Sequence, residues 1–373
     1  MKHITTLLLI LVSLGILHAE GFKLKNDIWF RGSYSAIEIQ NIYHNNYSLG
    51  AYYLPEIEYQ PLKTGNSKLD LMLGGYFNGQ LNLEQDTGED IELESTDLDW
   101  KAEVYRAWAR WSEPKYEVRL GLQKLNFGTA FILRNEQWFD SVDPTDAMGF
   151  TRGVWGGLLR YYTENNGTLW FWTILGDDDL KGNEYLSSKK YSLELGGRAQ
   201  LSIFGGEEAL SYHFRKLKKL SDINPEEEHR LALDGRWDTF VGLWYEATLS
   251  MYTTEAKLEK SHKYLTVGTD YTIGIGNGVH ALAEHLYQAT ANDQPLSSVD
   301  EMNHTALQLE YPIGLYESLQ GFAVYDWEME KLNTYIAISR TTDYLTMILS
   351  YGVSSVNINE TEKTIQFTLR MTY

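Results

Sequence analysis

The segment GTAFILRNEQWFDSVDPTDAMGFT, from Gly128 to Thr151, interrupts a chain that otherwise alternates between apolar and polar residues. An alternating stretch from Tyr116 to Gln123 precedes it, and a second one opens at Arg152. A connection this long, rich in aromatic residues and without period-2 alternation, does not form a tight hairpin. We therefore expect a loop that folds into the interior of a β-barrel and narrows it.

Alternating segments of roughly ten residues recur along the chain, and we count about 18 of them. From Tyr191 to Ile203, for example, one face is apolar and the other carries Glu194 and Arg198. The apolar faces run five or six positions, which matches the roughly 9 to 11 tilted residues that cross a bilayer and exceeds a typical soluble strand. The pattern predicts an all-β fold, a transmembrane antiparallel β-barrel of about 18 strands (16 to 18).

Long and short connections alternate along the sequence. Short turn sequences such as Glu164–Gly167 and Gly274–Gly278 separate longer connections. We place the longer ones near Asn41 and at Leu83–Leu98, Leu125–Thr151, Asp177–Lys189, Lys218–His229, Thr254–His262, Thr290–Met302 and Ser354–Lys363. A barrel with short periplasmic turns and longer outer loops produces this asymmetry, and an even number of strands places both termini on the periplasmic side.

The first residues have the layout of a secretory signal peptide, with Lys2, an apolar run from Ile4 to Leu17 and a small residue at Ala19. We expect residues 1–19 to be removed and residues 20–373 to form one barrel domain. The apolar run is shorter than the roughly 20 residues of a membrane anchor.

Composition limits the class of protein further. The chain has no cysteine, a formal net charge of -19, 26 Tyr and 11 Trp. The acidic balance disfavours nucleic acid as a partner. The aromatic content suits interfacial girdles of a membrane barrel, and the absence of cysteine excludes disulfide staples and a lipid-anchored lipoprotein.

The region from Gly121 to Tyr162 resembles a segment of porin-like outer-membrane barrels of Gram-negative bacteria, a broad group that includes alginate-export-like proteins. The shared features are a Gly-x-Gln strand end, an aromatic-Gly step, a Leu-Arg pair and an Asp-Pro-x-Asp turn. In this sequence they are Gly121 and Gln123, Phe127 and Gly128, Leu133 and Arg134, and Asp143–Asp146, with Phe127 where a Trp is more usual. The resemblance implies a diffusion or export channel in the cell outer membrane, and it identifies no solute.

Ion selectivity of a wide barrel is set by the charges at its narrowest point. We predict that the pore constriction and its selectivity depend on Arg119, Arg134, Asp140, Asp143, Asp146, Arg152 and Arg160. Acids of the loop opposite wall arginines, which include Arg198, Arg215, Arg230 and Arg236, would create a transverse field. Phe131, Trp138 and Phe139 would offer stacking surfaces for solute rings.

Each of these residues also has a structural interpretation. A wall arginine can pair with a neighbouring acid, as Arg230 and Arg236 can with Asp234 and Asp238. The Asp143–Asp146 segment can be a turn whose carboxylates cap local amides. Trp138 and Phe139 can form a small core that attaches the loop to the wall.

Two other functions stay open beside a passive channel. An adhesin or structural barrel would have a plugged lumen. An outer-membrane hydrolase would use His285, which falls on the lipid-facing side. His280 and Glu284 share the other face. No serine with a suitable base is evident, and we expect no enzyme.

The expected partners are outer-membrane lipid and lipopolysaccharide, small hydrophilic solutes, and the barrel-assembly machinery through the terminal Tyr373. The acidic segment Glu84–Asp99 is expected as a solvated outer loop that could bridge lipopolysaccharide through divalent cations. The histidine spacing indicates no metal site, and we expect no cofactor.

Overall fold

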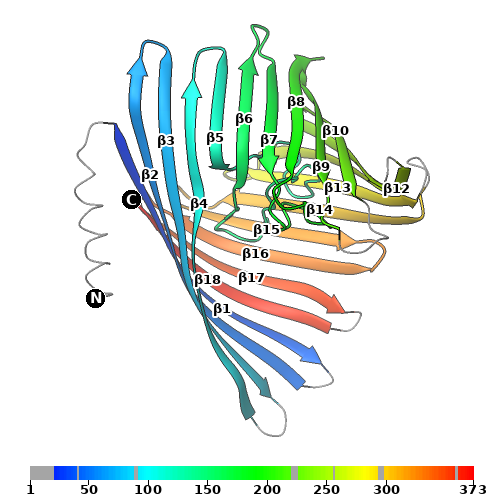
Figure 1. Ribbon diagram of the computed structural model, residues 1–373. Coiled ribbons are helices and arrows are strands. Elements are labelled where there is room, and N and C mark those ends of the chain that lie inside the picture. Colours follow the sequence, from blue (N-terminus) through cyan, green and yellow to red (C-terminus); the bar gives the residue numbers. More distant parts are fainter. Residues whose placement is uncertain are drawn as a thin grey trace.

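The computed structural model describes residues 21–39, 42–87, 91–219, 226–254, 257–292, 298–357 and 360–373 (Figure 1). The predicted signal peptide, residues 1–19, lies outside these residues. No helix of membrane-spanning length and hydropathy occurs in the part of the chain that the structure describes.

The described residues form 18 β-strands. They are β1 (Phe22–Ile39), β2 (Ile42–Thr64), β3 (Ser67–Thr87), β4 (Ile91–Ser112), β5 (Tyr116–Gln123), β6 (Val154–Tyr162), β7 (Thr168–Leu175), β8 (Leu193–Ile203), β9 (Gly206–Lys216), β10 (Glu227–Asp238), β11 (Gly242–Thr254), β12 (Lys257–Ile273), β13 (Val279–Asn292), β14 (Asp300–Pro312), β15 (Glu317–Asp326), β16 (Lys331–Thr341), β17 (Leu345–Asn357) and β18 (Glu360–Thr372).

Each strand pairs antiparallel with its sequence neighbours, and β1 pairs with both β2 and β18, so the sheet closes on itself. Asp27 lies opposite Thr372 in the closing pair, and the backbones of Asn26 and Tyr373 exchange two hydrogen bonds. Closure leaves no unpaired sheet edge among the described strands. A bilayer would not tolerate such an edge. The predicted barrel of 18 antiparallel strands is confirmed.

Side chains alternate between an outer and an inner face, as the sequence pattern requires. In β11, Leu243 is exposed on the outside, whereas Trp244, Glu246 and Ser250 are buried on the inside. The apolar face is thus the exposed one and the polar face is covered, the reverse of a soluble protein. Something inside the barrel must therefore cover the polar face.

The outer connections are shorter than predicted, because several expected loops are strand. The acidic segment Glu84–Asp99 lies in β3 and β4 except for residues 88–90, which are outside the described residues, and Glu84 pairs with Ser95. Since β5 ends at Gln123, the β3–β4 hairpin continues beyond its neighbour on the outer side (Figure 1). Residues 97–100 are all exposed, so beyond the membrane a charged strand has water on both faces. The segments Thr254–His262 and Ser354–Lys363 were also expected as loops, and most of their residues lie in strands.

Asp27 stabilises the β1–β18 seam. Its carboxylate accepts hydrogen bonds from Thr372 and Arg370 (3.1 Å) and pairs with Lys25 (2.9 Å).

We predict that Asp27→Asn lowers the free energy of unfolding by about 1–3 kcal/mol, because bonds to a charged acceptor are lost. Thermal unfolding of the detergent-solubilised protein measures this, with Asp238→Asn, an exposed partner of Arg236, as the matched control. Equal unfolding temperatures for the two variants would contradict the seam's role.

Candidate channel constriction

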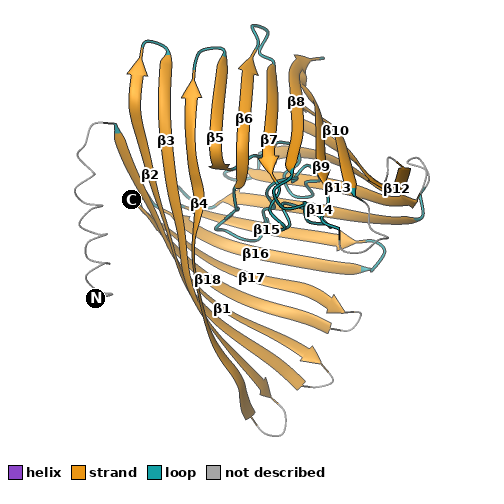
Figure 2. Cartoon of the chain, viewed as in Figure 1, coloured by secondary structure: helices purple, strands orange, loops and turns teal. Residues whose placement is uncertain are grey.

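Of the connections that the structure describes, two lie inside the barrel (Figure 2). One joins β5 to β6 through residues 124–153, and we call it the constriction loop. The other joins β7 to β8 through residues 176–192, and we call it the second inner loop. The predicted inward fold of the first is confirmed by its contacts with the wall, which follow.

Glu284 of β13 holds the middle of the constriction loop. Its buried carboxylate accepts hydrogen bonds from the backbone amides of Phe131 (2.7 Å), Ile132 (2.9 Å) and Leu133 (2.6 Å). The indole of Trp244 donates a further bond of 2.8 Å. Four donors converging on one carboxylate offset the cost of burying its charge.

Glu246 of β11 binds the same loop on either side of that point. It accepts the amides of Ala130 (2.7 Å), Asn135 (3.0 Å) and Glu136 (3.2 Å). Gly128 is required beside it, because its φ is +101° and a Cβ would lie 2.3 Å from a Glu246 oxygen. Sequence reasoning missed Glu246 as a functional residue and treated Glu284 only as a neighbour of His280. The available signal was that each is an acid on an otherwise neutral lumen face.

Apolar contacts complete the attachment on this side. Phe127, Trp138 and Phe139 pack on Trp172 of β7 in a buried cluster. Phe127 stacks on Trp172 with ring centroids 5.4 Å apart. Ala130 and Ile132 form a second cluster with wall residues of β11, β13 and β14.

The far end of the loop reaches the opposite wall. Asp146 pairs with Arg31 of β1. Phe150 stacks on Tyr76 of β3 at 4.2 Å and contacts Tyr105 of β4 at 5.5 Å. The loop therefore crosses the lumen and is held at both ends.

The Asp-Pro-Thr-Asp segment at the far end is a turn. Asp143 accepts the amide of Thr145 at 2.8 Å, and Asp146 accepts the amide of Met148 at 3.1 Å. Asp140 is buried, and its carboxylate lies 3.3 Å from the Lys124 ammonium. Of the three loop acids that were predicted at the constriction, Asp143 alone is both exposed and without an ion pair among the described residues.

The second inner loop joins the outer ends of β7 and β8, as predicted, but it folds into the barrel instead of extending outward (Figure 2). Lys181 is buried and donates to Glu194 (3.0 Å) and Ser188 (3.1 Å). Gly182 sits so close to the constriction loop that a Cβ would lie 1.9 Å from the carbonyl oxygen of Gln137. Sequence reasoning could not place this loop because its partners come from separate strands.

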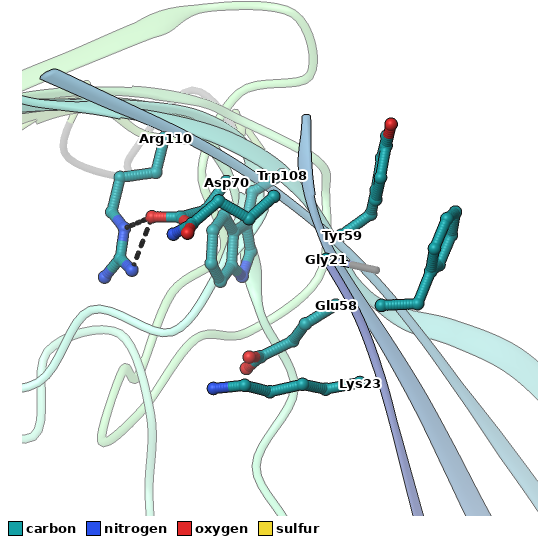
Figure 3. A pocket seen from close by; sticks show the side chains of 9 residues that line it. Gly21, Lys23, Glu58, Tyr59, Asp70, Trp108 and Arg110 are labelled. Atoms are coloured by element: carbon teal, nitrogen blue, oxygen red, sulfur yellow. Dashed lines mark hydrogen bonds and ion pairs between the residues drawn. The ribbon is translucent and has the colours of Figure 1, made fainter. Parts of the chain in front are cut away.

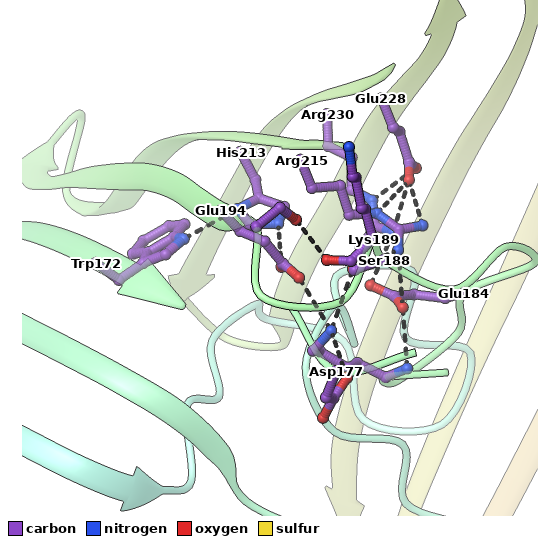
Figure 4. Close-up of polar contacts among 12 residues, drawn as sticks. Trp172, Asp177, Glu184, Ser188, Lys189, Glu194, His213, Arg215, Glu228 and Arg230 are labelled. Carbon is purple, nitrogen blue, oxygen red and sulfur yellow. Dashed lines mark hydrogen bonds and ion pairs between the residues drawn. The ribbon is translucent and has the colours of Figure 1, made fainter. Parts of the chain in front are cut away.

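The wall arginines near these loops are buried in ion pairs. Arg198 makes two bonds to Asp234, of 2.5 and 2.7 Å. Arg215 and Arg230 share Glu184 of the second inner loop at 3.0 and 3.3 Å, and both also pair with Glu228 (Figure 4). Acids already surround these arginines, and the transverse field between loop acids and wall arginines stays a prediction.

Arg119 and Arg160 lie near the periplasmic mouth instead of the constriction. Both pair with Glu117, at 2.9 and 3.6 Å. Arg119 lies over Trp108 (4.9 Å) and Arg160 over Trp170 (3.9 Å). These stacked pairs indicate a wall feature of the inner vestibule.

A hollow of about 190 Å³ adjoins Trp108 at this mouth (Figure 3). Arg110 bonds to Asp70 there (2.8 Å), and Lys23 and Glu58 line the same hollow. The hollow faces the periplasmic end of β1 to β4, so it is separate from the loops at mid-lumen.

The remaining predicted residues are divided between lumen and core. Arg134 bonds to Asn126 and the Phe127 carbonyl and lines a recess described below. Arg152 is exposed, 3.7 Å from Glu103. Phe131 is 47% exposed and contacts Trp244 edge-on at 5.0 Å.

Trp138 and Phe139 are 3% and 4% exposed, so they offer no ring face to a solute. The expectation of stacking surfaces at these two residues is corrected: they form the core that attaches the loop. Among the described residues, no group of three or more acidic or histidine side chains is arranged to hold a metal ion.

Open space remains between the constriction loop and β15 to β18. A hollow of about 240 Å³ lies between Thr145 and this part of the wall. Its lining is uncharged, and it consists of Thr145, Phe322, Asn333, Thr334, Tyr335, Ser350, Gly352, Val353, Ser354, Thr364 and Gln366. A solute passing here meets hydroxyl and amide groups.

Glu136 gives the loop a pH dependence. Burial raises the pKa of Glu136 well above its ordinary range, and the nearby Asp234 and Glu246 raise it further, against the effect of Arg198. The folded protein thus holds this proton at pH values where the unfolded chain has released it. The contribution of Glu136 to the free energy of unfolding is complete below the ordinary glutamate pKa of about 4.3. This contribution is lost as the pH rises toward the raised pKa.

We predict that Glu136→Gln, which is neutral at every pH, unfolds at a higher temperature than the wild type above about pH 5, with a gap that widens with pH. Unfolding temperatures measured from acid to alkaline pH in detergent test this. Glu164→Gln, an exposed partner of Lys115 in a periplasmic turn, is the control and should follow the wild type. A constant gap across pH would show that Glu136 is charged in the folded protein.

No protein-family model matches this chain, and no curated protein matches it in sequence. Solved structures do match. OccK7 (OpdD) of Pseudomonas aeruginosa has a TM-score of 0.60 at 10% identity, over 94% of this chain and 99% of that one. OccD3 (OpdP) of P. aeruginosa has a TM-score of 0.59 at 10% identity, over 95% and 92%. OccAB1 of Acinetobacter baumannii has a TM-score of 0.59 at 13% identity, over 95% and 98%. This chain therefore has the fold of these outer-membrane porins, the closed 18-stranded barrel.

Proposed function

We propose that the protein is an outer-membrane porin, a passive water-filled channel for small hydrophilic solutes. The observation that carries the proposal is the constriction loop, which crosses the lumen between Glu284 and Arg31 without filling the side next to β15 to β18. An apolar exterior, a polar interior and a fixed internal loop together restrict passage by size.

The charge selectivity follows from the same geometry. The passage beside Thr145 has an uncharged lining, and Arg198, Arg215 and Arg230 are neutralised by buried acids. We expect selectivity between anions and cations to be weak. Asp143 and Arg134 are the two loop charges best placed to bias it, since neither has an ion-pair partner among the described residues.

Membrane partners follow from the barrel surface. The apolar exterior suits outer-membrane lipid, and the exposed acids of the β3–β4 hairpin at residues 97–99 suit lipopolysaccharide bridged by divalent cations. Tyr373 is exposed at the β18 end, where the barrel-assembly machinery would recognise it. We expect the mature chain to begin after Ala19.

Catalysis has little support in the geometry. His285 hydrogen-bonds Thr305 (3.0 Å) on the outer face, and Trp327 donates to the same hydroxyl, an arrangement typical of an interfacial girdle. Glu284 is occupied by loop amides and His280 pairs with Asp270 (3.1 Å), so neither serves His285. The adhesin alternative requires a sealed lumen, which conductance tests.

We predict stable ion-conducting steps for the purified protein in a planar bilayer, with a small reversal potential in a salt gradient. Deleting residues 129–150 should increase the conductance several-fold. Glu284→Gln should make it larger and noisier, because an amide cannot accept three backbone N–H bonds at full strength. Glu310→Gln, on the inner face of the neighbouring β14, is the matched control and should conduct like the wild type. Silence across many insertions would contradict the channel and favour a plugged barrel.

A further inference from the structure

A third hollow lies on the outer side of the constriction loop. It measures about 370 Å³, within the range of small-molecule sites, and we call it the outer recess. It is bounded by both inner loops and by β10 to β13. Tyr252, which lines it, lies two residues before the outer end of β11, so the recess is near the outer side of the barrel. Its lining includes Arg134, Asn183, Tyr185, Ser250, Tyr264 and Gln288.

Tyr185 presents an aromatic surface to the recess. His262 stacks against one side of its ring, with centroids 5.0 Å apart and planes at 15°. Its hydroxyl meets that of Tyr264 (3.1 Å) and the side-chain amide of Gln288 (3.5 Å). Tyr185 is nevertheless 56% exposed, so the ring face away from His262 is available to a solute.

The ring is held rigidly. The preceding Glu184 is buried between Arg215 (3.0 Å) and Arg230 (3.3 Å), and Gly182 fits against Gln137 with no room for a side chain. Buried ion pairs of this kind contribute little net stability and fix geometry instead. A preorganised ring loses little entropy when it binds a ligand.

The groups around the ring are amides and hydroxyls. Asn183 and Gln288 flank Tyr185, and Ser250 and Tyr264 add hydroxyls. The acids Glu184 and Glu228 are both paired with Arg230, so they do not select an ion. An aromatic face within a rim of amides and hydroxyls fits a ring with an apolar face and a hydroxylated edge.

We propose that the outer recess is a binding subsite for a saccharide ring, which stacks on Tyr185 and bonds through its hydroxyls to Asn183 and Gln288 before passing the constriction loop. This inference rests on the proposed channel function for its purpose. Its binding chemistry depends only on the recess.

Two measurements test it, with the trisaccharide maltotriose as the probe. Added from the outer side, maltotriose should interrupt the ion current of the open channel. Isothermal titration of the detergent-solubilised protein should show saturable binding whether or not the channel conducts. Tyr185→Ala should weaken both by about 3- to 10-fold, the effect of losing one aromatic stacking partner. Tyr185→Phe should keep most of the affinity, and Leu180→Ala, an exposed change on the same loop outside the recess, should keep all of it.

The outcomes separate this inference from the channel itself. Ion conductance without interruption or binding by maltotriose overturns the subsite and leaves the channel in place. Binding without conductance supports the subsite and overturns the channel. The stacking on Tyr185 is overturned if Tyr185→Ala and the wild type bind maltotriose equally well. It is also overturned if the protein binds glutamate more tightly than the saccharide, and that result assigns the recess to acid recognition by Arg134.

Discussion

The structure depends on two buried carboxylates that bind the backbone of a loop. Glu246 and Glu284 project from neighbouring parts of the wall, and each accepts three amides of residues 130–136. A buried carboxylate without donors and a buried run of amides without acceptors are each costly. Each satisfies the other, so the loop has one stable place in the lumen.

This attachment divides the barrel into two unlike halves. On the side of β6 to β13, the two inner loops and the paired arginines fill the interior. On the side of β15 to β18, a hollow with an uncharged lining remains beside Thr145. The charges that a wide channel would use to sort ions are therefore mostly engaged in holding its loops, and hydroxyl and amide groups line the path.

The sequence predicted the parts of the fold that depend on local periodicity. Alternation from Tyr191 to Ile203 indicated the strand observed at Leu193–Ile203, and its recurrence indicated the number of strands. The loss of alternation at Gly128 indicated the inward loop. Local pairing along a strand was predictable, as for Arg236 with Asp238. The cluster of Glu184, Arg215 and Glu228 was not, because these residues meet only when the second inner loop enters the barrel. The acidic β3–β4 hairpin was expected as a loop, because a strand with charges on both faces cannot lie in a membrane. Such a strand is stable in water, and the hairpin extends there.

Hydrogen exchange at the amides of residues 130–136 tests the central claim most directly. In the detergent-solubilised wild type, the amides of Phe131, Ile132 and Leu133 should exchange far more slowly than those of an unbonded loop, because Glu284 accepts all three. In Glu284→Gln their protection should fall, while that of the β14 amides, which the sheet holds, should not. Fast exchange at these three amides in the wild type would mean that the carboxylates do not hold the loop, and the account of the constriction would be wrong.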